Sequence, residues 1–324
     1  MKIGILGAGK MAGKMTENIW AMKQAEIECV AVASRSLEKA EKFAAKYQIE
    51  KAYGSYEEML KEAKIDLVYI ATPHSHHYEH IKLCLQYNKN VLCEKAFTVN
   101  AKQAEEVTAM AKKKNLLLAE AIWTRYMPSR NIINEVIASG EIGAVHSLQA
   151  SLGYPISTVE RMIRSELAGG ALLDLGVYPI NFAMMVFGNE VESVNATALM
   201  FETGVDAMDS ITIKWKNGQM ALLHATMLTT TERRGVIQGE DGYLVVSNIN
   251  NPESVDVYDN LHQKKNHYDI PQQVSGYEYE LYACQKAILE KKVECEEMPH
   301  TDIIQIMKLM DEMRGQWGMK YKCE

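Results

Sequence analysis

The residues that could do chemistry begin with a glycine-rich turn, Gly7-Ala8-Gly9-Lys10-Met11-Ala12, which follows a short apolar run. In this G-x-G-x-x-A pattern Gly7 permits a tight turn, Gly9 lets the backbone approach a pyrophosphate, and Ala12 keeps the next helix close to a sheet. The helix start also offers free N–H groups to phosphate. We therefore expect Gly7, Gly9, Lys10, Met11 and Ala12 to bind a dinucleotide.

The end of the second expected strand bears on which dinucleotide binds. A site for NAD usually has Asp or Glu here for the ribose 2′-hydroxyl. This chain instead has Ser34 and Arg35, with Lys39 one helical turn beyond Ser36. Hydroxyl and guanidinium groups suit a 2′-phosphate, and arginine can also stack on adenine. We expect NADP in preference to NAD; the alternative is a solvated arginine at a helix start.

An acid–base pair, Glu94-Lys95, lies just beyond an apolar run at residues 90–93. Ligands bind at the carboxyl ends of strands in open α/β sheets. A lysine there can contact the nicotinamide ribose and a substrate hydroxyl, and its charge favours a nearby oxyanion. Taken alone, such a dipeptide is more often a solvated surface feature.

A third set of polar residues lies on an apolar helical pattern that begins after Gly169-Gly170. Asp174 and Tyr178 are spaced i,i+4 and share a helix face, and Asn181 continues that stripe. Buried polar groups need partners, which a hydroxyl-rich substrate could supply. Taken alone, a satisfied core tyrosine is the commoner explanation. Pro179 predicts a kink or a break in this helix.

Four of the nine histidines fall within residues 72–80. His76 and His80 are spaced i,i+4, which would suit a metal pair on a helix. The neighbouring sequence lacks carboxylates or cysteines in a ligand pattern, so we expect no metal. We favour a loop and helix start that line the cofactor, with Thr72, Pro73, His74, His77 and, from the neighbouring loop, Glu94 and Lys95 as binding residues.

Residues 1–121 alternate β-rich runs with helical patterns, which predicts a parallel sheet with right-handed crossovers. We expect a Rossmann dinucleotide-binding domain here, with strands over 2–6, 28–33, 52–53, 66–71, 90–93 and 116–120 and helices that include 36–47 and 100–114.

After Trp123 the pattern becomes α+β, and we expect one C-terminal domain over 122–324 with a large, mainly antiparallel open sheet. Lys216-Asn217-Gly218-Gln219 predicts a hairpin. A free sheet face can pair with a second subunit, so we expect a homodimer or higher homo-oligomer. The expected helices cover 129–139, 171–187, 276–291 and 301–315, and the strands cover 145–153, 191–202, 208–216, 219–230, 233–239 and 243–247.

Composition narrows the class of protein. The 324 residues are 47% hydrophobic and 24% charged, as in an ordinary globular protein. The net charge of −7 argues against a nucleic-acid partner. Residues 1–120 carry +3 and the remainder −10, which suits a phosphorylated cofactor in the first half. The six cysteines are scattered, and the sequence shows no signal-peptide pattern. It also has no apolar stretch near the roughly 20 residues of a membrane span. We therefore expect a cytoplasmic protein without a membrane partner.

Together these motifs resemble the glucose–fructose oxidoreductase/inositol dehydrogenase/MocA family along nearly the whole chain. The motifs that carry the resemblance are residues 7–12, 72–77, 94–96 and 169–178. Residues 119–126 and Tyr178 resemble the branch of dimeric dihydrodiol dehydrogenases and NADP-dependent xylose dehydrogenases. Other branches usually have His at or near Tyr178.

The resemblance implies nicotinamide-linked chemistry on sugars, polyols or related diols. It places the residues matching Lys95 and Tyr178 at the active site, gives Asp174 a part in orienting substrate, and puts Trp123 and Arg125 near the cofactor. The family motif is usually Glu-Lys-Pro, often with a cis peptide, whereas this chain has Ala96. A cis bond before Ala would cost about 2.5–4 kcal/mol, so we predict a trans Lys95–Ala96 bond.

We therefore expect an NADP-dependent oxidoreductase that transfers a hydride between nicotinamide and a carbinol or carbonyl carbon of a sugar, polyol or trans-dihydrodiol-like substrate in an interdomain cleft. Tyr178 would be the general acid/base. Lys95 would favour its phenolate and hold the substrate oxygen, or the two roles could be reversed. The alternatives are a non-catalytic NAD(P)-binding sensor and, less favoured, a hydrolase that binds a metal through His74, His76, His77 and His80. The substrate and the direction of reaction stay open.

Overall fold

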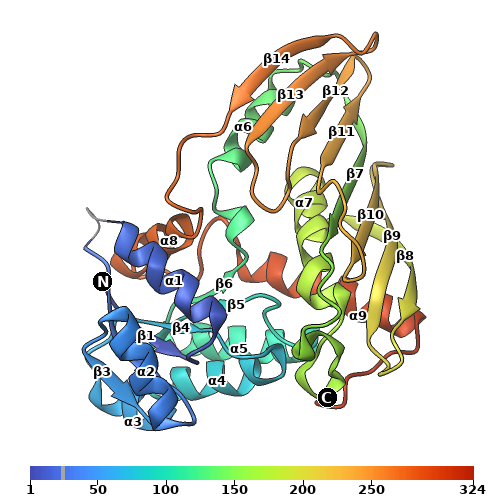
Figure 1. Cartoon of the computed structure of the whole chain (residues 1–324). Helices are drawn as coiled ribbons and strands as arrows, with labels where there is room; N and C mark the ends of the chain where they lie inside the picture. The colour runs from blue at the N-terminus through green and yellow to red at the C-terminus, as the bar shows by residue number, and fades with distance from the viewer. Residues whose placement is uncertain (23–25) are drawn as a thin grey trace. The chain divides into compact units, whose positions relative to one another are not determined.

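The structure is a computed structural model that describes residues 1–22 and 26–324 (Figure 1). Its chain forms two compact units. The first contains Met1–Trp123 and Gln273–Ile304, and the second contains Thr124–Gln272 and Gln305–Glu324. The sequence predicts that all residues after 121 belong to one C-terminal domain. In the structure, residues 273–304 belong instead to the first unit.

The first unit is built on a six-stranded parallel sheet with the order β3-β2-β1-β4-β5-β6. The strand order reverses between β1 and β4, and open α/β sheets bind their ligands at such a switch point. These strands confirm the Rossmann prediction, and their bounds are β1 Lys2–Leu6, β2 Glu28–Ala33, β3 Lys51–Tyr53, β4 Leu67–Ile70, β5 Asn90–Glu94 and β6 Leu118–Ala121.

Helices connect these strands, and several begin at a capping side chain. Ser36, Ser55 and Asn100 each accept a hydrogen bond from the N–H three residues on, which satisfies a free donor at the helix start. The connecting helices are α1 Lys10–Ala21, α2 Leu37–Tyr47, α3 Tyr56–Glu62, α4 His74–Gln86 and α5 Ala101–Lys114.

The returning segment packs along β6. The Leu118 N–H donates to the Val293 carbonyl at 3.0 Å, and the Leu118 carbonyl lies 2.8 Å from His300 Nε2. This segment contains helix α8, Glu278–Leu289, and the start of α9, His300–Gln316. Hydrogen bonds to a strand 175 residues away in sequence cannot be foreseen from local periodicity, which is why the sequence analysis misplaced it.

The second unit is built on an eight-stranded sheet with the order β14-β13-β12-β11-β7-β10-β9-β8. β7 and β10 pair in parallel, and the other neighbours pair antiparallel, which confirms a mainly antiparallel sheet. The strands are β7 Val145–Gly153, β8 Val191–Met200, β9 Asp206–Trp215, β10 Met220–Thr226, β11 Gly235–Gly239, β12 Gly242–Val246, β13 Ser254–Asp259 and β14 Lys264–Asp269.

The predicted hairpin joins β9 and β10, where the Trp215 N–H donates to the Gln219 carbonyl at 2.9 Å. The sequence analysis missed β13 and β14. β14 reads KKNHYD and is largely exposed at the sheet edge, so it lacks the alternation that marks a half-buried strand.

One face of this sheet packs against the helical segment Leu172–Phe187. The second unit also contains helix α6, Ser129–Ala138. The stretch Ser165–Phe187 is long and apolar enough to cross a membrane, so the expectation that no such stretch exists is wrong. However, 89% of its apolar window is buried inside the protein, as in a core helix. Its hydropathy therefore reflects packing against the sheet.

Candidate active site

The glycine-rich turn lies where β1 meets α1. Gly7 has a φ of +97° and donates its N–H to the Ala33 carbonyl at 2.9 Å. A Cβ added there would lie 2.9 Å from the Ala71 carbonyl oxygen, so a larger residue does not fit. At Gly9 the nearest protein atom would be 4.0 Å away, which leaves room for a ligand. Within the described residues no side chain caps α1, so its first N–H groups face that space.

The residues expected to determine the preference for NADP over NAD follow β2. Ser34 is buried and its N–H donates to the Tyr53 carbonyl at 3.1 Å. Arg35 and Lys39 are exposed, and Ser36 caps α2 through the Lys39 N–H. The Arg35 charge adds to burial in lowering the pKa of His76, so Arg35 lies close to the start of α4. The loops after β2 and β4 therefore share one edge of the sheet.

The histidines lie at the start of α4, and they differ in environment. His77 is fully buried, and burial lowers its pKa to about 4. His80 Nδ1 lies 3.0 Å from Thr72 Oγ1, and burial with the neighbouring histidines lowers its pKa to about 4 as well. These rings are neutral at pH 7. Among residues 1–22 and 26–324, no three His, Cys, Asp or Glu side chains form a group that could hold a metal ion.

Lys95 follows β5 in a loop held by tertiary hydrogen bonds. The Tyr69 hydroxyl donates to the buried Glu94 carboxylate, and Lys95 itself is half-buried. Beyond it, the Phe97 N–H donates to Glu120 Oε1 at 3.0 Å. Glu120 and Tyr69 were not predicted, because neither residue shows its role in the local sequence.

The Lys95–Ala96 peptide bond is cis, so the prediction of a trans bond is wrong. That prediction weighed only the local preference of a non-proline peptide. The loop is instead fixed from both sides, by His77 Nδ1 at 2.8 Å from the Ala96 carbonyl and by Glu120 on the Phe97 N–H. Tertiary contacts at these atoms lie outside what the dipeptide alone can indicate.

The returning segment adds residues behind Glu94. Trp123 stacks on Tyr277, with ring centroids 4.3 Å apart and planes 17° apart. Glu280 is fully buried, and burial together with the Glu94 charge raises its pKa well above the ordinary range. Tyr277 and Glu280 were not predicted, because the sequence pattern assigns this segment to the other domain.

In the second unit, Asp174 forms an ion pair that was not predicted. Arg161 Nη1 and Nη2 lie 3.1 Å from Asp174 Oδ1 and Oδ2, a bidentate arrangement that fixes both groups. The Asp174 side chain is 7% exposed and that of Arg161 is 45% exposed. The pair thus holds a carboxylate in place and presents part of a guanidinium to solvent. Arg161 lies outside every motif, so the sequence offered no signal for it.

Tyr178 and Asn181 follow on α7, Val177–Phe187, and both are buried. Arg125, also buried, donates from Nε to Asn181 Oδ1 at 2.8 Å, and Asn181 Nδ2 donates to the Val177 carbonyl at 2.8 Å. Protein groups therefore satisfy Asn181, where the sequence analysis allowed for a substrate. The burial of Arg125 also means that it supports this helix from within the second unit.

Asp174 lies on a π-helical turn, Leu172–Gly176, in which the Val177 N–H reaches back to the Leu172 carbonyl. The expectation of one α-helix with Asp174 and Tyr178 at i,i+4 is therefore wrong in detail. The prediction of a kink or a break at Pro179 is wrong, because α7 runs through Pro179 from Val177 to Phe187. Pro179 lies in the first turn of α7, where the missing backbone N–H is tolerated.

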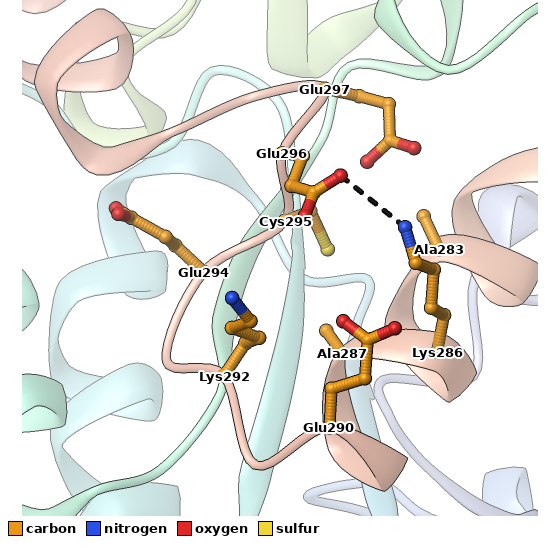
Figure 2. Close-up of a pocket in the computed structure, with 9 residues that line it drawn as sticks. All are labelled: Ala283, Lys286, Ala287, Glu290, Lys292, Glu294, Cys295, Glu296 and Glu297. Atoms are coloured by element: carbon orange, nitrogen blue, oxygen red, sulfur yellow. Dashed lines mark hydrogen bonds and ion pairs between the residues drawn. The ribbon is translucent and has the colours of Figure 1, made fainter.

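Figure 2 shows a separate surface hollow lined by charged side chains, in which Lys286 pairs with Glu296 at 3.3 Å. Lys292 and Cys295 also line it, and the intervening Val293 bonds Leu118, the first residue of β6. The hollow therefore lies near the amino end of β6. The glycine-rich turn and Lys95 lie at the carboxyl ends of their strands, so this hollow is not the predicted cofactor site.

The parallel sheet and its glycine-rich turn define a Rossmann dinucleotide-binding protein with a second, sheet-based unit. Two family models match the chain: "Oxidoreductase family, NAD-binding Rossmann fold" over residues 1–121, and "GFO/IDH/MocA C-terminal domain" over residues 132–245. The chain belongs to the GFO/IDH/MocA oxidoreductase family, which confirms the resemblance seen in its sequence.

Curated relatives match over the full length. The trans-1,2-dihydrobenzene-1,2-diol dehydrogenase of Xenopus tropicalis is 35% identical, with 99% of each chain covered. The protein of the same name from Danio rerio is 32% identical, with 99% of this chain and 98% of that protein covered. Both relatives are named as dehydrogenases, and the chain is a dehydrogenase or reductase of this family.

Solved structures show the same architecture. KijD10, a 3-ketoreductase from Actinomadura kijaniata solved with NADP and TDP-benzene, matches with a TM-score of 0.88 and 25% identity over 97% of each chain. An aldose-aldose oxidoreductase from Caulobacter crescentus matches with a TM-score of 0.88 and 19% identity over 98% of each chain. The second likeness shows the fold alone.

Proposed function

We propose that the protein uses NADP to oxidise or reduce a CH–OH or carbonyl carbon of a trans-dihydrodiol, sugar or polyol. The observation that carries this proposal is the half-buried Lys95 on the loop after β5, beside the β1/β4 switch point where the glycine-rich turn leaves room for a dinucleotide. Full-length similarity to dihydrodiol dehydrogenases favours a diol among these substrates.

The choice of NADP rests on the end of β2. This position has the exposed Arg35 in place of the acid that an NAD site usually has, and its guanidinium suits a 2′-phosphate. The similarity to KijD10, which was solved with NADP, supports the same choice. The proposed cofactor-binding set is completed by Gly7, Gly9, Lys10, Met11, Ala12, Ser34, Lys39, Thr72, Pro73, His74, Glu94, Lys95, Trp123 and Arg125.

When bound, NADP would supply or accept the hydride at its nicotinamide ring. We assign proton transfer at the substrate oxygen to the Tyr178 hydroxyl. The Lys95 ammonium holds that oxygen and stabilises the negative charge that develops on it. Asp174, held by Arg161 in a bidentate pair, orients a substrate hydroxyl as an acceptor.

The test is a spectrophotometric screen of NADP reduction and NADPH oxidation against trans-dihydrodiols, aldoses, polyols and dicarbonyls. With the best substrate, Tyr178→Phe should lower kcat by about 10²–10⁴-fold, the usual contribution of a general acid or base. Tyr282→Phe is the matched control, because Tyr282 is 43% exposed on α8. Near-wild-type turnover of Tyr178→Phe would contradict the tyrosine's role. Tight NADP binding without turnover of any substrate would instead favour the sensor.

We also propose a homo-oligomer that forms through the open face of the second unit's sheet. Leu222 on β10 is 47% exposed there, between Gln149 of β7 and Thr212 of β9, and Met220 and Leu199 are also exposed. Large apolar side chains on a flat sheet face are typical of subunit contacts.

All six cysteines are free, which supports a reducing, cytoplasmic location.

A further inference from the structure

His77 makes two unusual contacts for a buried histidine. Its Nε2 lies 2.8 Å from the Thr72 carbonyl oxygen, and its Nδ1 lies 2.8 Å from the Ala96 carbonyl oxygen. The side chain has no exposed surface. A neutral imidazole has one N–H, so one tautomer donates to Thr72 and the other donates to Ala96. In either case the ring is confined between two backbone carbonyls.

These carbonyls belong to two different loops of the first unit. Each lies two residues after the end of a strand: Thr72 after β4, which ends at Ile70, and Ala96 after β5, which ends at Glu94. β4 and β5 are neighbours in the parallel sheet, so both loops leave the same edge. The Thr72 loop is also adjacent to Gly7, because a Cβ at Gly7 would meet Thr72 Cγ2 at 3.1 Å. His77 therefore connects the loop after β4, which lies beside the glycine-rich turn, to the loop after β5, which contains Lys95.

The same contacts argue against the role expected from the sequence, which grouped His77 with residues that touch the cofactor. A ring without exposed surface, and with both nitrogens directed at protein carbonyls, has no polar atom left for a ligand. His76, one position earlier, is half-buried, and its ring centroid lies 5.7 Å from that of His80. The two adjacent histidines thus have different surroundings.

We propose that His77 is a positioning residue that clips the loop after β4 to the loop after β5 and thereby sets the backbone of Lys95. The clip acts through the Ala96 carbonyl, which belongs to the residue bonded directly to Lys95. In the same peptide group, the Phe97 N–H donates to Glu120 Oε1 at 3.0 Å. The two contacts together fix the Ala96–Phe97 peptide group, which follows the residue bonded to Lys95. The kinetic consequence rests on the proposed function, whereas the clip itself does not.

The experiment compares His77→Phe, which keeps a ring but has no donor, with His77→Gln, whose amide NH2 group can still donate. His76→Phe is the matched control. Hydrogen–deuterium exchange is followed by mass spectrometry in peptides covering residues 71–76 and 94–99. We expect exchange in His77→Phe to be about tenfold faster in the peptide whose carbonyl accepts the His77 N–H, as for the loss of one net hydrogen bond. Exchange in the other peptide, which loses only its contact with the ring, should rise by a smaller factor. His77→Gln should lie between His77→Phe and the wild type, and His76→Phe should match the wild type.

Kinetics separate positioning from cofactor binding. In His77→Phe, kcat should fall at least about tenfold, whereas the Kd of NADP should rise by a smaller factor, because the glycine-rich turn is intact and only the loop over residues 72–74 is loosened. Unchanged exchange in either peptide, or a Kd that rises while kcat is unchanged, would overturn the proposal. If His77→Phe does not fold, His77→Gln decides both measurements. If the wild type turns over no substrate, the proposed function fails, and the exchange data still test the clip.

Discussion

At the scale of single residues, the two cationic side chains assigned to recognition have different environments. Arg35 is exposed at the end of β2, where a ligand phosphate could reach it from solvent. Arg161 is committed to Asp174 through two hydrogen bonds, and Asp174 is nearly buried. Removing Arg161 would take a bidentate partner from a nearly buried carboxylate, whereas Arg35 is exposed to solvent. Arg35 is therefore the cleaner position for testing cofactor choice.

Arg35→Ala should raise the Kd of NADP by about 10–100-fold, since a hydrogen bond to a charged group contributes roughly 1.5–3 kcal/mol. The Kd of NAD should change little, because NAD lacks the 2′-phosphate. Fluorescence titration of both cofactors measures the ratio. Lys42→Ala is the control, because Lys42 is an exposed cation on α2 that pairs with Glu38 at 2.6 Å. An NADP-to-NAD affinity ratio equal to that of the wild type would exclude the assignment of Arg35.

At the scale of elements, the close packing of α1 against α2 depends on a glycine outside the expected motif. A Cβ at Gly13 would lie 2.5 Å from the Tyr47 hydroxyl oxygen. That hydroxyl is held by Glu17 at 3.0 Å and by Lys46 at 2.7 Å, so it cannot move aside freely. Gly13 thus sets the position of α1, whose first turn forms the floor of the proposed phosphate site.

Gly13→Ala should lower the free energy of unfolding by about 1–3 kcal/mol, as for other overpacked sites. Gly315 offers a control within α9, because a Cβ there meets no atom within 4 Å. Gly315→Ala should instead raise stability by up to about 1 kcal/mol, since alanine is the better helix former. Urea unfolding of both variants measures the two signs. A Gly13→Ala variant more stable than the wild type would contradict this prediction, because it would show that the Tyr47 side chain moves to make room for the added methyl group.

At the scale of the whole molecule, the two units carry separate parts of the proposed machinery. The first unit has the glycine-rich turn, the His77 contacts and Lys95, and the second has Arg161, Asp174 and Tyr178. The second unit also has the open sheet face. On β10 the exposed and buried residues alternate, so Met220 and Leu222 lie on the face opposite the helical layer.

Leu222→Lys should shift the protein from oligomer to monomer, because a charged side chain at the centre of an apolar contact must lose its hydration on association. Light scattering coupled to gel filtration measures the mass against the 36.5 kDa of one chain. Leu261→Lys is the control, because Leu261 is 76% exposed in the turn between β13 and β14. A wild-type mass of one chain, or an unchanged oligomer in Leu222→Lys, would exclude this face as the interface.

Much of the fold was predictable from the chain because its signals are local. β-rich runs located β1 and β2 to the residue, and the helical patterns expected over 36–47 and 100–114 begin one residue before α2 and α5. The G-x-G-x-x-A pattern likewise needs only one turn and its flanking elements. Edge strand β14 was missed because exposure removes the periodicity on which such predictions depend.

The sequence by itself therefore determined the family, the Rossmann sheet and the position of Lys95 after a buried strand, since each depends on residues close together in the chain. Tertiary structure alone decided the Arg161–Asp174 pair, the His77 contacts, the return of residues 273–304 to the first unit and the cis Lys95–Ala96 bond. Each of these depends on atoms from separate segments meeting at hydrogen-bonding or packing distance. Local periodicity and propensity contain no information about such meetings, because they measure only the preferences of neighbouring residues.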